Sequence, residues 1–228
     1  MPGDRPWLHK WNVLEVAIAF SVANNIVGDY LEFGVFQGGS FIHAYQHRRH
    51  VFGRYRRSQR RHTDDAFLAA TTRFFAFDSF EGLPATNQDE IPLHWRGEAA
   101  MSCTEPEFRA NLEAAGVDLA DVVTVPGYYG VSLTPETGAR IGLKRAAVVN
   151  VDCDLGASTV PVLDFLDPYI VDGTVLVFDD WFYYRGHPAR GEHGAFDAWL
   201  AGHPELVASE LVRLYPTVAF ILNRRDEA

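Results

Sequence analysis

Apolar and polar residues follow two periods along the chain, and these periods predict strands and helices in turn. Short apolar runs between turn residues predict buried strands, whereas apolar positions three or four residues apart predict helices. Strands are predicted at 29–36, 73–84 (ending at Asp78), 121–127, 145–154, 173–180, 209–215 and 217–224. Helices are predicted at 12–27, 40–52, 105–116, 158–170 and 191–204.

The alternation of strands with helices predicts an α/β fold with a mostly parallel sheet whose faces are covered. The last two strands flank Pro216 as an antiparallel hairpin, so we expect one antiparallel strand at an edge of the sheet. The length of 228 residues fits one domain over residues 1–228, in which 1–27 form an N-terminal helical or lid segment. We interpret the arginine-rich stretch 53–65 as a solvated loop, with a clamp for an anionic substrate as the alternative.

Composition and charge narrow the class of protein. A net charge of −10 argues against general binding to nucleic acid, which needs surplus lysine and arginine. No apolar run approaches the length of a membrane span, and the N-terminus lacks the pattern of a signal peptide. The only cysteines are Cys103 and Cys153, which argues against a disulfide framework. We therefore expect a cytoplasmic protein that binds neither nucleic acid nor membrane.

Two predicted strands end in pairs of acidic residues. "VNVDCDLGAST" (149–159) carries Asp152 and Asp154, and "VLVFDDW" (175–181) carries Asp179 and Asp180. Clustered carboxylates are costly unless they are protonated, paired or neutralised by a cation. Strand ends that meet at one rim would join the four acids, and oxygen ligands favour Mg²⁺. The alternative is that one of these aspartates only caps the segment that follows it.

The first strand runs into a glycine turn, "EFGVFQGGS" (32–40), that opens the next helix. Its glycine spacing differs from the dinucleotide fingerprint. Glu32 within the turn suits a ligand with a positive charge and an amino group, such as S-adenosylmethionine, whereas a pyrophosphate would be repelled. Asp78, at the tip of the second strand, is placed to accept hydrogen bonds from both ribose hydroxyls. A purely structural turn is the alternative.

Four motifs in this order resemble the macrocin O-methyltransferase family: "DYLEFGVFQGGS", "FAFDSFEGLP", "VNVDCDLGAST" and "LVFDDW". The resemblance runs from about residue 28 to the end of the chain. It implies a class I methyltransferase fold, Rossmann-like, with a seven-stranded, mostly parallel sheet whose last strand is antiparallel. It also implies an enzyme, a homodimer, that uses S-adenosylmethionine and Mg²⁺ to methylate a hydroxyl of a small molecule, such as an antibiotic sugar. The chain departs from the family at Gly156, where relatives usually carry a large residue.

By the same resemblance, Asp154 is the general base and the metal ligands are Asp152, Asp179 and Asp180. The chemistry agrees, because a bound cation favours the alkoxide and a nearby carboxylate can remove the proton. We expect contacts to the acceptor from Trp181, His187 and His193. The residues expected to bind the cofactor are Glu32, Phe33, Gly34, Val35, Phe36, Ser40, Asp78, Ser79, Phe80, Gly127, Tyr128 and Asp152.

Other interpretations account for less of the sequence. A metal-dependent glycosyltransferase would use the D-x-D of Asp152 and Asp154 but leaves the glycine turn without a role. A phosphatase needs its aspartate nucleophile on an early strand, and a binding module gives no reason for four clustered acids. His43, His47 and His50 share a helical face that suits zinc, but no third-ligand pattern accompanies them, so we interpret them as a solvated face.

Overall fold

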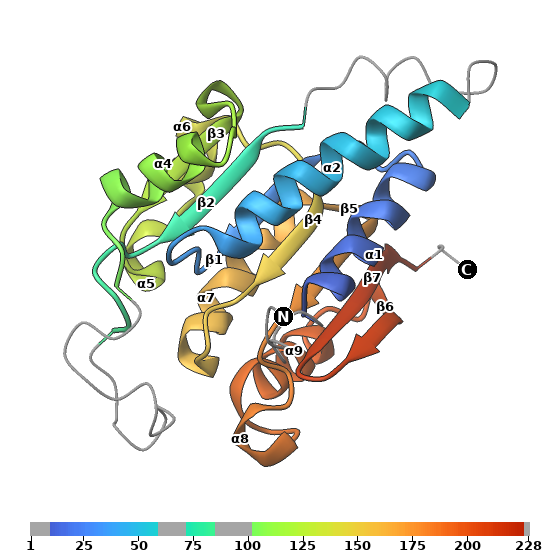
Figure 1. Cartoon of the computed structure of the whole chain (residues 1–228). Helices are drawn as coiled ribbons and strands as arrows, with labels where there is room; N and C mark the ends of the chain where they lie inside the picture. The colour runs from blue at the N-terminus through green and yellow to red at the C-terminus, as the bar shows by residue number, and fades with distance from the viewer. Residues whose placement is uncertain (1–9, 59–71, 85–101, 226–228) are drawn as a thin grey trace, which may run out of the picture.

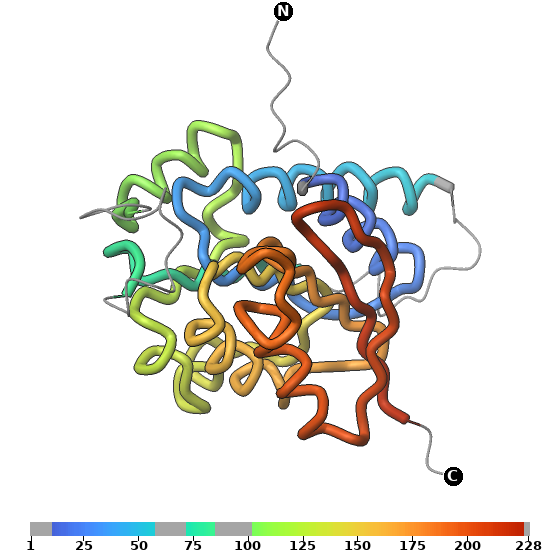
Figure 2. The backbone as a smooth tube through the Cα atoms, turned by 90° about the horizontal axis from the view of Figure 1, so that it is seen from below, coloured from blue at the N-terminus to red at the C-terminus, as the bar shows by residue number. Residues whose placement is uncertain are grey.

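The computed structural model describes residues 10–58, 72–84 and 102–225, which form a seven-stranded sheet between two layers of helices (Figures 1 and 2). The strand order is β3-β2-β1-β4-β5-β7-β6. The strands are β1 (Asp29–Phe33), β2 (Phe74–Asp78), β3 (Val122–Pro126), β4 (Ala146–Val151), β5 (Ile170–Phe178), β6 (Leu206–Leu214) and β7 (Thr217–Arg224).

The directions of the strands confirm the predicted seven-stranded sheet, which is mostly parallel and has an antiparallel last strand. Strands β1 to β5 pair in parallel, and β7 pairs antiparallel with both β5 and β6. The prediction that the antiparallel strand lies at an edge is wrong, because β7 lies between β5 and β6. Burial explains the order: β7 begins with three buried residues, whereas β6 exposes charged side chains such as Glu210, which suit an edge strand.

Helices cover both faces of the sheet, as Figure 2 shows in a view turned from that of Figure 1. One apolar cluster joins the sheet to α1 (Lys10–Ala23), α2 (Gly39–Ser58) and α4 (Glu105–Ala114). A second cluster joins the other face to α7 (Gly156–Leu166) and α9 (Gly191–Ala201). The remaining elements are α5 (Tyr129–Ser132), α6 (Pro135–Ile141), α8 (Tyr183–Gly186) and the short 3₁₀ helices η4 (Leu119–Asp121) and η5 (Asp167–Tyr169). No helix in the described parts of the chain is both long and apolar enough to cross a membrane.

The central strands are buried on both sides, which explains why they read as continuous apolar runs. In β1, Tyr30 packs into the cluster with α1 and α2, and its neighbour Leu31 packs into the cluster with α7 and α9. Every residue of β1 and β4 is buried. Parallel strands covered by helices on both faces have this pattern.

Several boundaries differ from the prediction. Helix α2 continues to Ser58, through part of the stretch 53–65 that we expected to be a loop, because arginine is a good helix former. The rest of that stretch, from residue 59, lies outside the described residues. Strand β4 ends at Val151, so Asp152 and Asp154 lie in the connection to α7. Helices α5 and α6 were not predicted, because each is short and contains glycine.

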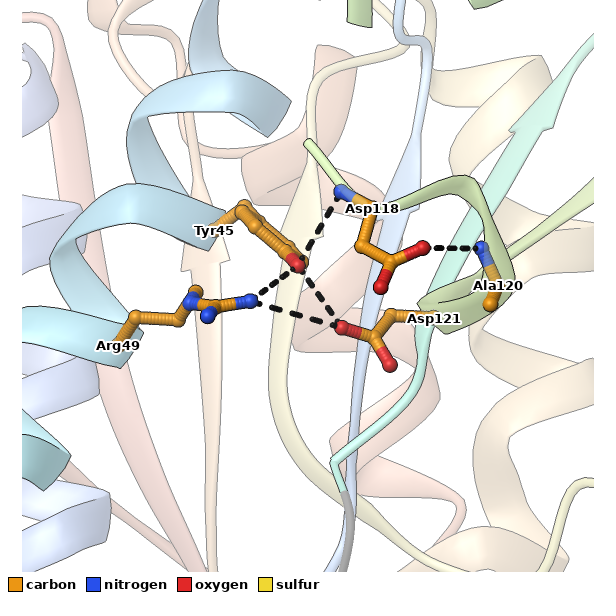
Figure 3. A network of polar contacts seen from close by, with 5 residues as sticks. All are labelled: Tyr45, Arg49, Asp118, Ala120 and Asp121. Carbon is orange, nitrogen blue, oxygen red and sulfur yellow. Dashed lines mark hydrogen bonds and ion pairs between the residues drawn. The ribbon is translucent and has the colours of Figure 1, made fainter. Parts of the chain in front are cut away.

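A network of polar contacts fixes α2 against the start of β3 (Figure 3). The Tyr45 hydroxyl donates to Oδ2 of Asp121 over 2.8 Å and accepts from Arg49 over 2.7 Å. The backbone N–H of Asp118 also donates to this hydroxyl, over 3.3 Å, and the Asp118 side chain caps Ala120. The network holds the start of β3 against α2, the helix that follows the glycine turn.

Candidate active site

The ends of β1 and β4 meet where the strand order changes direction. The sheet grows from β1 toward β3 on one side and from β4 toward β6 on the other. The backbone N–H of Asp152 donates to the carbonyl of Phe33 over 2.9 Å, so the two strand ends are in direct contact. Open α/β sheets bind their ligands at such a switch point, beyond the carboxyl ends of the strands.

Gly34 makes this close approach possible. Its φ is +89°, in the region that favours glycine, and an added Cβ would lie 1.8 Å from the carbonyl oxygen of Asp152. A side chain at residue 34 would push the two strand ends apart. The glycine predicted for a tight turn is therefore required by both backbone conformation and space.

Asp78 holds the glycine turn in place. Its Oδ2 accepts hydrogen bonds from the backbone N–H groups of Val35 (2.8 Å) and Phe36 (3.1 Å). Its Oδ1 accepts from the N–H of Phe80 over 2.8 Å. Each carboxylate oxygen has two lone pairs, so Oδ2 is filled by its two N–H donors and Oδ1 can accept one more hydrogen bond, from a ligand.

A cavity of about 420 Å³ opens beside these strand ends. Volumes of about 300–1,000 Å³ are typical of sites for small molecules and cofactors. Its wall also includes residues that the sequence did not single out, among them Trp11 of α1, Tyr129 of α5 and Pro161 of α7. The predicted site residues that line it are Gly34, Val35, Phe36, Ser40, Asp78, Ser79, Tyr128, Asp152 and Asp154.

Four residues predicted to bind the cofactor do not line the cavity: Glu32, Phe33, Phe80 and Gly127. Glu32 is fully buried beneath the turn, where its carboxylate accepts hydrogen bonds from Ser40 and Tyr30. Burial first, and then the neighbouring Glu32, raises the pKa of Tyr30 well above its usual value. Phe33 is also fully buried and stacks on a phenylalanine of β2. These two side chains support the turn from below.

Three of the four predicted acids converge. One carboxylate oxygen from each of Asp152, Asp154 and Asp180 lies within 4.8 Å of the others. Asp154 has a φ of +64°, so the alternation of side chains along the strand does not extend to it. The fourth acid, Asp179, is buried and accepts a hydrogen bond from the Thr217 hydroxyl over 3.0 Å.

Burial and the crowding of carboxylates raise the pKa of a member of the cluster. Burial raises the pKa of Asp180 well above its usual value, and the nearby Asp154 and Glu192 raise it further. Oδ2 of Asp180 is buried and has no hydrogen-bond partner. A proton or a cation is needed to offset the repulsion at this cluster.

Glu192 is a further buried acid beside the cluster, and the sequence did not single it out. It is completely buried in the first turn of α9, and its Oε2 accepts a hydrogen bond from the backbone N–H of Asp180 over 2.9 Å. Oε1 is buried without a hydrogen-bond partner. Burial raises its pKa, as do the neighbouring Asp179, Asp152 and Asp154. A glutamate twelve residues beyond the acid pair gave no pattern to identify it.

The residues expected to contact the acceptor lie outside the cavity wall. Trp181 is only 3% exposed and packs among Phe178, Phe196 and Phe220 of the core. Its ring stacks on His193 with centroids 4.1 Å apart. His187 is exposed in the turn after α8. Trp181 is therefore a core residue, His187 belongs to the segment between α8 and α9, and His193 lies in the first turn of α9.

Comparison with known proteins adds to this geometry. Residues 8–190 match the model of a protein family described as macrocin-O-methyltransferase (TylF). The chain is 30% identical over 200 residues to 8-demethyl-8-(2,3-dimethoxy-alpha-L-rhamnosyl)-tetracenomycin-C 4'-O-methyltransferase of Streptomyces olivaceus. The aligned region covers 83% of this chain and 68% of the relative. It is 24% identical over 201 residues to mycinamicin III 3''-O-methyltransferase of Micromonospora griseorubida, with coverage of 83% and 71%.

Two solved structures share the fold. The O-methyltransferase NovP superposes with a TM-score of 0.71 at 20% identity, covering 95% of this chain and 81% of NovP. CalS11, a calicheamicin methyltransferase, superposes with a TM-score of 0.66 at 20% identity, covering 92% and 78%.

Proposed function

The chain belongs to the macrocin O-methyltransferase family, and we propose that it methylates a sugar hydroxyl of a glycosylated natural product. Membership makes it an S-adenosylmethionine-dependent O-methyltransferase, and this assignment replaces the glycosyltransferase interpretation of the D-x-D. Support for a sugar acceptor comes from the relatives, whose names place the methyl group on a sugar of tetracenomycin or on mycinamicin. We further propose that residues 1–228 act as one domain, with the N-terminal helix reaching the active site through Trp11.

The cavity suits the cofactor in volume and charge. The missing side chain of Gly34 leaves the strand ends close together, and Asp78, Asp152 and Asp154 supply negative charge to the wall. A cationic sulfonium ligand is favoured in such a cavity. We propose that S-adenosylmethionine lies across the turn from Gly34 to Ser40 and that Oδ1 of Asp78 accepts a hydrogen bond from its ribose.

The acid cluster suits a hard divalent cation. Three carboxylate oxygens converge there, and Oδ2 of Asp180 is buried without a partner. We propose Mg²⁺, with Asp152, Asp179 and Asp180 as its ligands. The converging oxygens are those of Asp152, Asp154 and Asp180, so Asp179 enters this ligand set on the family resemblance and on its place next to Asp180 in the chain. When bound, the cation would favour the ionised form of the acceptor hydroxyl.

Asp154 is the general base in this proposal. Asp154 lines the cavity and also belongs to the acid cluster. It can therefore accept the proton of an acceptor hydroxyl that lies between the cofactor in the cavity and a cation at the cluster. The hydroxyl oxygen forms the new bond to the methyl carbon as the bond from sulfur to that carbon breaks. The cavity walls contribute by aligning the two reactants.

The convergence of Asp152, Asp154 and Asp180 beside the cavity carries the proposal, and methyl transfer from labelled S-adenosylmethionine tests it. The acceptors are glycosylated antibiotics offered beside their aglycones. We expect label only on the glycosylated compounds, and loss of turnover in EDTA that added Mg²⁺ restores. Label on the aglycones would refute the sugar acceptor, and full turnover in EDTA would refute the metal.

A further inference from the structure

A second group of metal-binding side chains lies away from the acid cluster, where α1 packs against α2. Glu15 belongs to α1, and His43 and His47 lie one turn apart on α2. One ligand atom from each residue lies within 4.8 Å of the others. The sequence supplied no third ligand for these histidines, because the glutamate is 28 residues away from His43 and comes from a different helix (43 − 15).

The distances within this group fit a tetrahedral site. Oε1 of Glu15 lies 3.0 Å from Nε2 of His43 and 3.7 Å from Nδ1 of His47. Zinc binds nitrogen and oxygen at about 2.1 Å, so two ligands of a tetrahedral ion lie about 3.4 Å apart. The two observed distances fall on either side of this value.

The direction of the His43 ring supports a shared ion more than a direct hydrogen bond. Its Nε2 lies 3.0 Å from Oε1 of Glu15, close enough for an ion pair, yet it is buried with no hydrogen-bond partner. Two ligands of one ion have this relation, since both point at the metal and neither points at the other. Burial lowers the pKa of His47, which favours the neutral ring that binds metals.

We propose that Glu15, His43 and His47 bind a zinc-class divalent cation that joins α1 to α2. Two imidazoles and one carboxylate are a borderline-soft set, in contrast to the all-carboxylate cluster at the strand ends. With water as the fourth ligand, the set is that of a tetrahedral zinc ion. The inference does not depend on the proposed function.

The site would also act on the cavity through Trp11. The Trp11 ring stacks on His43 with centroids 4.9 Å apart, and Trp11 forms part of the cavity wall. A cation that holds His43 to Glu15 would therefore fix α1 and Trp11 at the edge of the cavity. We expect zinc to raise the stability of the protein and to tighten the binding of S-adenosylhomocysteine.

The test uses the untagged, metal-free, full-length protein and titrates it with Zn²⁺, and with Co²⁺ as a spectroscopic substitute. Glu15→Gln and His47→Gln each remove one ligand and keep a polar side chain. His50→Gln is the matched control, because His50 lies on the same helix, is exposed and is not part of the group. Asp180→Asn reports whether the acid cluster takes the metal instead. Far-UV circular dichroism confirms that each variant is folded.

We expect the wild type, His50→Gln and Asp180→Asn to bind one equivalent, with the visible spectrum of tetrahedral Co²⁺. Glu15→Gln and His47→Gln should lose that spectrum and bind more than about tenfold more weakly, since loss of an outer-shell partner alone costs 10–100-fold. The proposal is wrong if the wild type takes up no zinc, if both ligand variants bind like the wild type, or if only Asp180→Asn loses the metal.

Discussion

Asp78 has two roles that a single substitution would confound. Three backbone N–H groups donate to its carboxylate, from Val35, Phe36 and Phe80, and the same side chain forms part of the cavity wall. Removing the carboxylate therefore disturbs the glycine turn as well as any contact to the ribose. Two variants are needed to separate these roles.

We expect Asp78→Ala to weaken the binding of S-adenosylhomocysteine by about 1–3 kcal/mol, the range for a lost charged hydrogen-bonding group. Asp78→Asn keeps one acceptor oxygen for the turn and should be affected less. Calorimetry measures both, with Asp164→Asn as a control, because Asp164 is exposed on α7. Unchanged affinity in Asp78→Ala would remove Asp78 from the cofactor site.

The assignment of Asp154 as base and Asp180 as ligand predicts opposite defects. Asp154→Asn should keep Mg²⁺ and cofactor binding while methyl transfer slows by about 10²–10⁴-fold, the usual contribution of a positioned base. Asp180→Asn should lose Mg²⁺ affinity. Metal titration alongside single-turnover methyl transfer measures both. If Asp154→Asn loses the metal and keeps its rate at saturating Mg²⁺, Asp154 is a ligand and the base is another residue.

Glu192 should act through the backbone of Asp180. Glu192→Ala leaves the buried N–H of Asp180 without its 2.9 Å partner, which costs about 1–3 kcal/mol of folding free energy. Glu192→Gln keeps an acceptor there and should retain most of the stability and the Mg²⁺ affinity. Thermal denaturation and metal titration measure the two properties. Equal losses in both variants would mean that the charge of Glu192, and not its hydrogen bond, is what the site requires.

At the scale of the elements, the sequence predicted best what burial determines. The five central strands were found because both their faces are apolar. Helices α5 and α6 were not predicted, because their four and seven residues, respectively, are too few to show a helical period. Strand β4 ends at Val151, and Asp154, three residues later, takes a positive φ that no apolar pattern indicates.

Gly156, the departure from the family pattern, has a structural reason at the contact between α7 and α9. A Cβ at Gly156 would lie 2.9 Å from the carbonyl oxygen of Gly191, at the start of α9. A larger residue would push away the segment that carries Glu192 and follows the acid pair. The small residue thus sets the distance between α7 and the segment expected to contact the acceptor.

We expect Gly156→Ala to destabilise the protein by about 1–3 kcal/mol, as overpacking does. Gly130→Ala is the matched control, since an added Cβ there meets nothing within 4 Å and Gly130, like Gly156, lies in a helix. Chemical denaturation compares the two variants. Equal stability of Gly156→Ala and the wild type would show that the contact between α7 and α9 adapts to the extra methyl group.

At the scale of the whole molecule, the sequence predicted the directions of the strands but not the order in which the last strands lie side by side in the sheet. The hairpin around Pro216 was found, yet its pattern did not tell which of its strands pairs with β5. The acid cluster was found because its members end two adjacent strands. Glu192 and the pairing of Glu15 with the α2 histidines were missed because contacts between separate elements, and not a local sequence pattern, bring them to their partners.

The clustered acids predict that the stability of the protein depends on pH, and the proposed Mg²⁺ site predicts that it also depends on the metal. The pKa values of Asp180 and Glu192 are raised in the folded state, chiefly by burial, whereas in the unfolded chain they are near 4. The stability that these groups contribute is therefore fully present below about pH 4 and is lost as pH rises through the raised values.

If Mg²⁺ binds as proposed, it replaces the protons at the cluster, so its stabilising effect should grow with pH. We expect the melting temperature of the wild type in EDTA to fall relative to that of Asp180→Asn as the buffer goes from weakly acidic to weakly alkaline. Added Mg²⁺ should close this gap in the wild type and have little effect on Asp180→Asn. Comparison with the variant cancels the titration of groups elsewhere, such as His47, whose pKa is lowered. A gap that stays constant with pH, or a Mg²⁺ effect that is equal in both proteins, would show that no cation takes the place of the protons at Asp180.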